Sequence, residues 1–596
     1  MSENIEKLRT LLEKTADLTR KVNGGTEGLT VDDMNQEITG NETVTAFASA
    51  NKTIDTNDMW QYARTIALPE GISFIPSKFC SPGFGDNNIL RKVTFPSTVY
   101  GIGFSAFYYC RKLEEINVPP NLSYIHSNAF NGCEKLKYAN LAFPSSLQTI
   151  GEYAFFRCYG LTGSLTIPSS LTSMGSRAFD YTPIDSLIYH ASVMNQAAFA
   201  DCSKLVSATF TSDELLTLPN NCFKDCVSLA TVNLPPNLID IGGGAFNDTG
   251  LTSITLPSGI TSIKTGTFSS CIYLSGVTFL GDIATIGDYA FANCRSLSSF
   301  SIPQTVTRIG ELAFAGAMIT SVNIPSATTE IGDGAFRCTT LQSIAVDPGN
   351  HAYDSRDNCN CLIKTVGNKL LQGSSDSVIP STVTSIEDNA FFGIGIDSLE
   401  IPSSITKIGE AAFDSCSISS VWLPNSIVSL GERAFNNCES LTSIHFPPAG
   451  SLVEIPDNLC AGCRSLTGVS IPDGYTLIGS GAFANSGLVQ VALPQDLETI
   501  EYNAFSYTNL ESIEIPASVT KIEPDAFSYN DQLDGHILVH YPNPINQLSG
   551  DDTYLKNVLR SFYAERLIHI EILDGDGVTT QVNLEDYFSG GSGSGD

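Results

Sequence analysis

Apolar and polar positions recur along this chain in one pattern, approximated by LxSIxIPxxVTxIGxxAFxxCxx. An alanine–phenylalanine step anchors most copies, and successive anchors lie 20 to 27 residues apart, except for a gap of 55 before Phe391. So short and regular a period predicts a solenoid in which each copy forms one coil. The anchors are Phe107, Phe130, Phe155, Phe179, Phe199, Phe223, Phe246, Phe268, Phe291, Phe314, Phe336, Phe391, Phe413, Phe435, Phe483, Phe505 and Phe527, with Cys80 and Cys460 in the same position.

Each copy is expected to begin with a short strand. In the copy at 251–268, Ile254 and Leu256 alternate with polar residues, and Pro257 ends the strand because proline has no N–H to donate. A second extended piece and a compact turn then return the chain to Phe268. A single coil cannot bury its apolar edge, whereas stacked coils with strands about 4.8 Å apart can. We therefore expect a continuous parallel sheet along the array.

The unit resembles the BspA-like subclass of leucine-rich repeat proteins through IPxxVTxIGxxAFxxCxxL, as at 302–314 and 401–416. The resemblance covers residues 63–540 and implies a repeat solenoid of mainly short parallel β-strands with turns. The irregular segment 346–372, with its DPxNxxY start, is similar to a hairpin insertion of that family. Members are chiefly binding and adhesion scaffolds, so the resemblance predicts the fold more sharply than the ligand.

Four regions follow from this pattern. Residues 1–50 form a helical leader, 51–540 the solenoid, 541–588 a C-terminal cap and 589–596 a Gly/Ser tail that is either natural or added. The cap is expected to combine a helix at 551–567 with a hairpin, and to protect the last sheet edge.

The leader has two alternative roles. Leu8, Leu11, Leu18 and Val22 form a short helical seam that either caps the first coil or associates with a second copy. Its KLR…KT helix followed by LTxxDM is similar to the leader of bacteriophage tail-associated proteins. That resemblance implies a virion protein that contacts other virion proteins through residues 1–40.

Charge and hydropathy restrict the classes of partner that the chain can bind. Acidic residues outnumber basic ones 63 to 32, giving a net charge of −31 that disfavours nucleic acid and anionic lipid. No apolar run is long enough to span a membrane, and the start MSENIEKLRTLLEK has no apolar core of a secretory signal. We expect synthesis in a host cytoplasm and incorporation into a virion, or alternatively a cell-surface location reached by a non-classical route.

The cysteines follow the repeat and are predicted to be reduced core thiols. Two pairs, Cys359 with Cys361 and Cys222 with Cys226, have metal-like spacing but no histidines nearby, so we expect no metal and no cofactor. Ten cysteines lie three residues after an anchor: Cys110, Cys133, Cys158, Cys202, Cys226, Cys271, Cys294, Cys416, Cys438 and Cys463.

Catalytic motifs are absent from the sequence. It contains no HExxH, GxSxG, Walker A loop or GxGxxG before a helix, and the seven histidines are scattered. Asp574 and Asp576 lie in LDGDGV, which is typical of a hairpin turn and only weakly of a calcium loop. The sequence predicts a protein that is not an enzyme.

Recognition by an exposed surface is the remaining function. The outward position of each strand is mostly Ser, Thr or Asn, which by itself only keeps a sheet soluble. Trp422 and His445 interrupt this column on adjacent coils, and with Glu400 and Ile188 they are the candidate ligand-binding residues. The alternative for Trp422 is packing against a neighbouring loop. We expect a phage protein that binds a host-surface glycan or protein, or alternatively a bacterial or protist adhesin or interaction scaffold.

Overall fold

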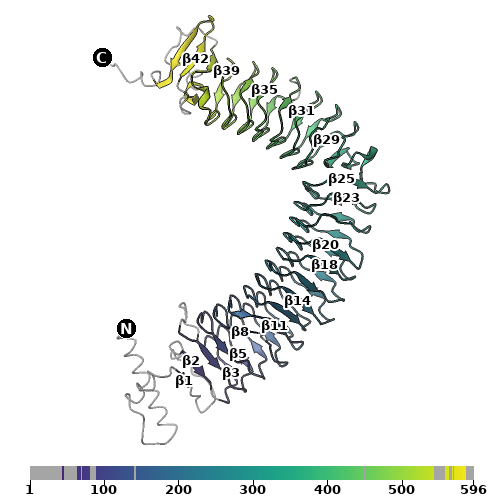
Figure 1. Cartoon of the computed structure of the whole chain (residues 1–596), viewed down its shortest axis with the longest axis vertical. Coiled ribbons are helices and arrows are strands. Elements are labelled where there is room, and N and C mark those ends of the chain that lie inside the picture. Colours follow the sequence, from purple (N-terminus) through teal and green to yellow (C-terminus); the bar gives the residue numbers. More distant parts are fainter. Residues whose placement is uncertain are drawn as a thin grey trace, which may run out of the picture. The chain divides into compact units, whose positions relative to one another are not determined.

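The computed structural model describes residues 43–45, 64–68, 70–80, 89–139, 142–448, 450, 452–541, 558–562, 567 and 569–585. These residues form a parallel β-solenoid, which confirms the predicted fold class (Figure 1). The coils divide into two compact units, Met1–Asp282 and Ile283–Asp596, each described separately below. The predicted seam at residues 4–22, the phage-like leader motif and the 589–596 tail lie outside the described residues.

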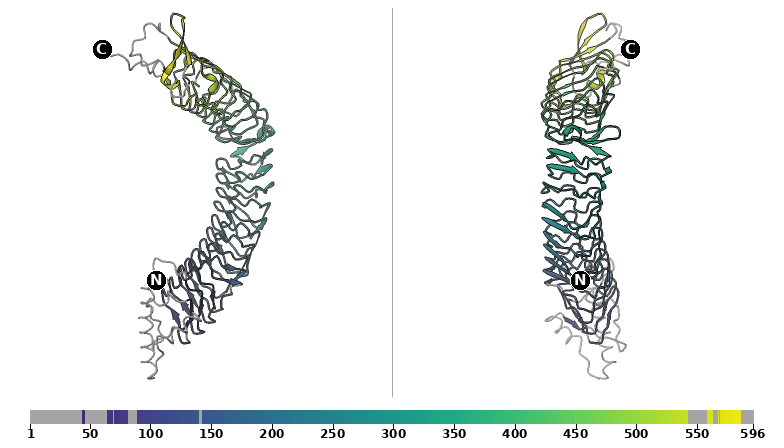
Figure 2. Two further views of the ribbon diagram at one scale, coloured as in Figure 1. Left: turned by 60° about the vertical axis from the view of Figure 1, so that its left-hand side comes forward. Right: turned by 90° about the vertical axis from the view of Figure 1, so that its right-hand side faces the viewer.

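Most coils of unit 1 contribute strands to two parallel ladders (Figure 2), although the coil between β13 and β14 has no strand in the second. The first ladder contains β1 (Thr43–Thr45), β2 (Thr65–Ala67), β4 (Lys92–Thr94), β6 (Glu115–Ile116), β8 (Tyr138–Ala139), β10 (Leu161–Thr162), β11 (Ser164–Ile167), β13 (Ser186–Tyr189), β14 (Ser207–Phe210), β16 (Thr231–Asn233), β18 (Ser253–Leu256) and β20 (Gly276–Phe279). The second contains β3 (Phe74–Ile75), β5 (Gly101–Ile102), β7 (Tyr124–Ile125), β9 (Thr149–Ile150), β12 (Ser173–Met174), β15 (Thr217–Leu218), β17 (Asp240–Ile241) and β19 (Ser262–Ile263).

Unit 2 has the same two ladders. The first contains β23 (Ser321–Ile324), β25 (Ser343–Val346), β31 (Ser420–Trp422), β33 (Ser443–His445), β35 (Gly468–Ser470), β37 (Gln490–Ala492), β39 (Ile513–Ile515) and β41 (Ile537–His540). The second contains β21 (Thr285–Ile286), β22 (Arg308–Ile309), β24 (Glu330–Ile331), β29 (Ser385–Ile386), β30 (Lys407–Ile408), β32 (Ser429–Leu430), β34 (Glu454–Ile455), β36 (Leu477–Ile478), β38 (Thr499–Ile500) and β40 (Lys521–Ile522). Two short 3-10 helices, η2 (Arg356–Asn358) and η3 (Asp531–Leu533), interrupt them.

A third ladder, which the sequence did not reveal, runs through the turns around most anchors. The backbone N–H groups of Tyr153, Phe155 and Arg157 donate to carbonyls of the next coil at 2.8 to 3.0 Å. Tyr153 and Arg157 reach this geometry with φ of 55° and 57°, in the left-handed region. The turns therefore form a regular hydrogen-bonded face opposite the first ladder, which we call the turn face.

The anchor phenylalanines form the core of each unit. In unit 1, neighbouring rings from Phe107 to Phe268 stack with centroids 5.0 to 5.8 Å apart and are nearly parallel. In unit 2, the ring of Phe413 lies 5.0 Å from Phe391 and 5.2 Å from Phe435. All these rings are buried, which matches the predicted interior.

The insertion in unit 2 is built from β26 (Tyr353–Asp354), β27 (Leu362–Lys364) and β28 (Lys369–Gln372), paired antiparallel in that order. Two residues of the DPxNxxY motif attach it to the coil before it. The Nδ2 atom of Asn350 donates to the carbonyls of Pro325 and Thr328 at 2.8 and 2.9 Å. The hydroxyl of Tyr353 accepts from the N–H of Ile331 at 2.9 Å. The motif thus replaces the backbone pairing that a regular coil would supply.

The C-terminal end of unit 2 extends the first ladder. Strand β41 pairs parallel with β42 (His569–Leu573), which forms an antiparallel hairpin with β43 (Thr579–Asn583). Of the helix expected at 551–567, residues 558–562 and 567 are described. Residues 558–562 are helical, whereas Leu567 is not. Phe562 packs on the last anchor, Phe527, with ring centroids 5.4 Å apart. Among the described residues, no helix has both the length and the hydrophobicity needed to span a membrane.

Candidate binding surface

The outward column of the first ladder is exposed, as expected from strand alternation. In β18, Ile254 and Leu256 are buried and Thr255 between them is exposed. The same alternation holds in β31, where Val421 is buried and Trp422 is exposed. The column therefore forms a ladder of solvent-facing side chains along each unit.

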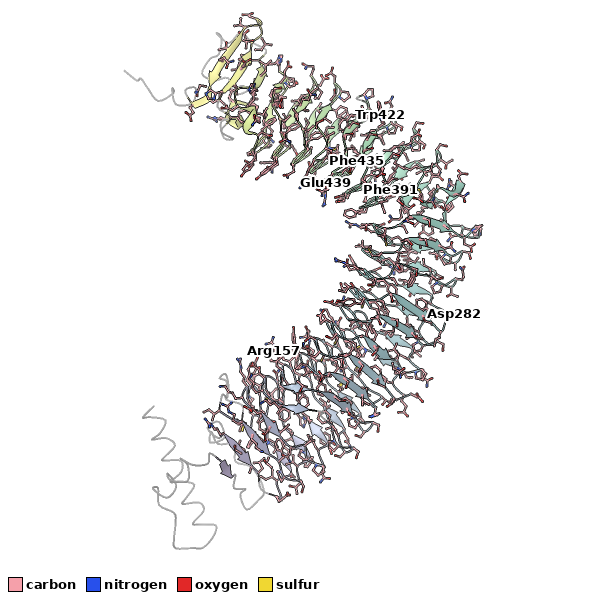
Figure 3. All side chains as sticks on the ribbon, in the orientation of Figure 1. Arg157, Asp282, Phe391, Trp422, Phe435 and Glu439 are labelled. Carbon is pink, nitrogen blue, oxygen red and sulfur yellow. The ribbon has the colours of Figure 1, made fainter. Side chains whose placement is uncertain are left out.

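Trp422 lies in unit 2 at the outer edge of the coils (Figure 3), where its ring meets that of His445. Parallel pairing of β31 with β33 places them directly opposite each other. Their ring centroids lie 3.6 Å apart with an interplanar angle of 18°, so the imidazole covers one face of the indole. Trp422 still exposes 69% of its surface, so it is not packed under a neighbouring loop.

Glu400 occupies the same register one coil earlier. The N–H of Ser419 donates to the carbonyl of Asp397 at 3.1 Å, and Glu400 and Trp422 each lie three residues further along their coils. Glu400 is exposed and belongs to no strand. His445 covers one face of the Trp422 indole from the following coil. The other face is therefore on the side of the preceding coil, which carries the exposed carboxylate of Glu400.

Ile188 lies in unit 1 and does not share the ladder segment of the other three candidates. It pairs with Thr166 on one side and Thr209 on the other. It exposes 37% of its surface. It is a single apolar side chain in a threonine column, which needs no functional explanation.

The cysteine ladder lies inside the coils and is not part of this surface. All sixteen cysteines are buried. Most ladder thiols donate to the carbonyl of the anchor one coil earlier, as Cys416 does to Phe391 at 2.9 Å and Cys438 to Phe413 at 3.1 Å. Where threonine replaces cysteine, the hydroxyl bonds within its own coil, as Thr182 does to Phe179 at 2.6 Å.

Sequence reasoning missed one member of this ladder. Cys338 follows its anchor by two residues rather than three, yet its thiol donates to the carbonyl of Phe314 at 3.1 Å. Burial raises the pKa of Cys338 to about 12 and that of Cys271 to about 11. These groups are therefore neutral thiols that pair a carbonyl of the coil wall, and they are poor nucleophiles.

Comparison with known proteins agrees with this repeat geometry. The model of the BspA type leucine-rich repeat region (6 copies) matches residues 77–206, 191–275, 266–371, 364–455 and 453–558. The chain belongs to this family. None of the curated proteins compared with the chain matches it.

Three solved structures are similar to this BspA-type chain. A leucine-rich repeat protein of Eubacterium ventriosum is 23% identical, covers 59% of this chain and 87% of its own, with a TM-score of 0.45. One from Bacteroides ovatus is 22% identical, with 71% and 91% covered and a TM-score of 0.35. A leucine rich cell surface protein of Faecalibacterium prausnitzii is 24% identical, with 85% and 95% covered and a TM-score of 0.30.

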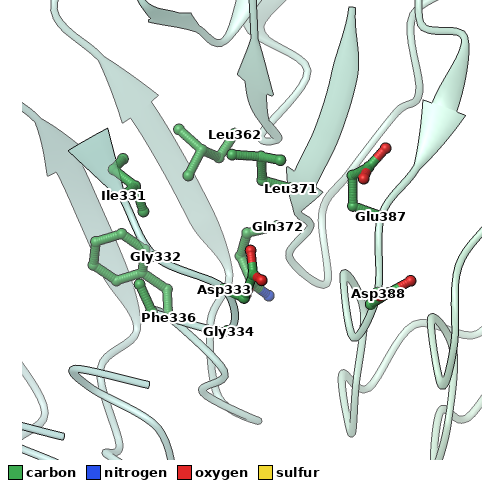
Figure 4. A pocket seen from close by; sticks show the side chains of 11 residues that line it. Ile331, Gly332, Asp333, Gly334, Phe336, Leu362, Leu371, Gln372, Glu387 and Asp388 are labelled. Carbon is green, nitrogen blue, oxygen red and sulfur yellow. The ribbon is translucent and has the colours of Figure 1, made fainter. Parts of the chain in front are cut away.

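One pocket of about 70 Å³ lies where the insertion interrupts the BspA-type coils of unit 2 (Figure 4). That volume holds about two waters, whereas ligand pockets are roughly 300–1,000 Å³. Its lining includes Gln372, whose Nε2 donates to the carbonyls of Gly373 and Ala390 at 3.0 Å each. The pocket is a packing irregularity and too small for an organic ligand.

The residues that the sequence offered as metal ligands form hydrogen bonds with nearby parts of the chain. Cys359 and Cys361 are buried, and the thiol of each donates to the backbone carbonyl of the other. The hydrogen bond with Cys361 lowers the pKa of Cys359. The carboxylate of Asp574 accepts from the N–H groups of Asp576 and Val578 at 3.0 and 2.9 Å, as a turn residue does. In the part of the chain that the structure describes, no group of three or more potential ligands is placed to hold a metal ion.

Proposed function

We propose that this protein is a non-enzymatic recognition scaffold that binds a surface glycan or protein through the Trp422–His445 pair. The observation that carries the proposal is the exposure of an indole stacked on imidazole, on a rigid ladder otherwise rich in small polar residues. Membership of a repeat family of binding scaffolds supports a recognition role. The small volume of the pocket at the insertion also favours recognition by a surface.

The chemistry of the pair fits an anchor for a ligand. An indole that is already stacked loses little side-chain freedom on binding, so more of its buried apolar area contributes to affinity. Tryptophan is also enriched among the few interface residues that dominate binding energy. Glu400, on the open side of the indole, would accept hydrogen bonds from a ligand's hydroxyl or amide groups.

Replacing Trp422 with alanine should weaken attachment at least about 30-fold, the effect of a binding hot spot of about 2 kcal/mol. The free energy of unfolding should change by less than about 0.5 kcal/mol, because the side chain is exposed. Binding is measured on a glycan microarray and on immobilised fibronectin and mucin, and stability by urea unfolding.

Tyr529→Ala is the matched control, since Tyr529 also exposes 69% of its surface but follows an anchor on the turn face of the same unit. It should leave the same binding signals unchanged. Equal losses of binding and stability for Trp422→Ala would assign Trp422 a structural role. Unchanged binding would refute the proposed surface.

The second part of the proposal concerns the particle or cell on which the scaffold is displayed. The leader's similarity to phage tail-associated proteins supports a virion protein that contacts a host surface. The alternative, supported by the repeat family, is a protein displayed on a cell surface. Electron microscopy with a gold-labelled antibody against this chain should decorate the tails of phage particles. Label on cell envelopes instead would assign the alternative.

A further inference from the structure

The turn face of unit 1 carries a second cluster of aromatic side chains. Two positions follow each anchor phenylalanine before the ladder position. They hold aromatic residues or arginine in the coils of Phe107, Phe155 and Phe179, with one aspartate, whereas the intervening coil of Phe130 holds Asn131 and Gly132. We define the Tyr–Arg patch as Tyr108, Tyr109, Tyr153, Phe156, Arg157 and Tyr181. Figure 3 places Arg157 on the opposite edge of unit 1 from Asp282.

The rings of the patch contact one another in edge-to-face pairs. Phe156 contacts Tyr153 at 5.3 Å and Tyr181 at 5.7 Å between centroids, with interplanar angles of 90° and 88°. Tyr108 and Tyr109 form a similar pair at 4.5 Å. Because each ring is held by a neighbour, the exposed parts form a preorganised apolar surface.

Arg157 is the unusual member of the patch. Its guanidinium carbon lies 5.0 Å from the centre of Phe156 and 5.7 Å from that of Tyr181, within the range of cation–π attraction. Because aromatic rings do not take up its N–H groups as an oxygen acceptor would, a guanidinium held this way keeps them available for a planar, two-oxygen acceptor. Arg157 is exposed, so this edge reaches solvent.

The neighbouring arginines already have carboxylate partners. Arg111 lies 3.5 Å from Glu134, and Arg177 lies 3.5 Å from Asp180. Among the described residues, Arg157 has ring partners but forms no ion pair. The patch therefore offers one cation that forms no ion pair among the described residues, in a chain whose net charge is −31.

Acidic neighbours limit the kind of anion that fits. Asp201 follows Tyr181 in the same position of the next coil, and its charge raises the pKa of Tyr181. A polyanion on Arg157 would lie close to Asp201 and would be repelled by the whole chain. A ligand with one carboxylate and many hydroxyls avoids this repulsion, because hydroxyls donate hydrogen bonds to a carboxylate such as Asp201.

From this arrangement we infer that the Tyr–Arg patch binds a carboxylated saccharide. Arg157 holds the sugar carboxylate, the rings of Phe156 and Tyr181 contact the apolar face of the pyranose, and Asp201 accepts its hydroxyls. The site deepens the proposed recognition function but does not depend on Trp422, which belongs to the other unit and to a strand column.

Calorimetric titration of the full chain tests the site with four probes. Sialyllactose and tetragalacturonate carry the carboxylate on different sugars, while lactose and the methyl ester of tetragalacturonate are their uncharged counterparts. At least one acid should bind about tenfold or more tightly than its neutral counterpart, equivalent to about 1.4 kcal/mol. The acid that binds identifies the sugar class.

Variants assign the contacts. Arg157→Gln should remove the preference for the acid, and Tyr181→Ala should weaken acid and neutral sugar alike. Arg295→Gln, the same charge change at an exposed residue outside the patch, should have no effect. Trp422→Ala should also leave binding intact, which separates this site from the Trp422–His445 surface.

Four outcomes would overturn the inference. They are the absence of binding by either acid, equal binding of acid and neutral sugar, an unchanged preference in Arg157→Gln, and equally tight binding of a glutamate-rich peptide. The last would mean that the patch captures acidic polypeptide rather than sugar.

Discussion

Replacing Phe413 with alanine should lower the free energy of unfolding by about 3–5 kcal/mol. The ring is fully buried and stacks on Phe391 at 5.0 Å and on Phe435 at 5.2 Å. Its removal deletes both contacts and leaves a cavity that the hydrogen-bonded coil walls cannot close. Urea unfolding, followed by circular dichroism, measures the change.

Phe413→Leu is the matched control, because it retains most of the buried volume and should lose less stability than Phe413→Ala. Hydrogen exchange should show the largest loss of protection in the coils on either side of residue 413, since a solenoid transmits destabilisation to its nearest neighbours. A loss below about 1 kcal/mol in Phe413→Ala would contradict a core built on stacked anchors.

Asp180→Asn should stabilise the protein above neutral pH by about 1–3 kcal/mol, because it removes a charge from a buried site. Asp180 is fully buried. Its Oδ2 lies 3.5 Å from Nε of Arg177, but neither carboxylate oxygen has a hydrogen-bond partner among the described residues. Desolvation raises the pKa of Asp180 to about 7, although Arg177 opposes the shift. The folded state thus binds the proton more tightly than the unfolded chain, whose carboxyl has a pKa of about 4.

The sign of the pH dependence follows from that difference. Below pH 4 the Asp180 carboxyl is protonated in both the folded and the unfolded protein, so no buried charge destabilises the fold. Between pH 4 and 7 the unfolded chain ionises first, so the wild type loses stability as the pH rises. The advantage of Asp180→Asn should therefore be small at pH 4 and complete above pH 7, as thermal unfolding at several pH values will measure.

Asp414 provides a control of opposite sign, since it occupies the same turn position, one residue after its anchor. It too is buried, but its carboxylate accepts from Asn436 at 2.9 Å and from Arg433 at 3.2 Å. Asp414→Asn should destabilise the protein at pH 8, because it removes a paired charge and leaves Arg433 without it. Stabilisation by both substitutions would contradict the difference in partners.

The period of the sequence alone determined the solenoid, its phenylalanine core and the buried thiols. Each follows from a rule that one coil obeys by itself: apolar residues alternate in a strand, and an anchor repeated in every coil meets its own copy when coils stack. The same rule placed Trp422 and His445 on one exposed column, because adjacent coils bring equivalent positions together.

Only the tertiary structure decided what depends on contacts between different positions of neighbouring coils. Cys338 joins the thiol ladder although its spacing is irregular, because its sulfur reaches the carbonyl of Phe314. Asp180 and Asp414 follow equivalent anchors, yet one has hydrogen-bond partners for its carboxylate and the other has none. The Tyr–Arg patch likewise arises from unlike residues on successive coils. A repeat period fixes which positions of neighbouring coils are in contact. The side chains at those positions decide the energy and the chemistry of each contact.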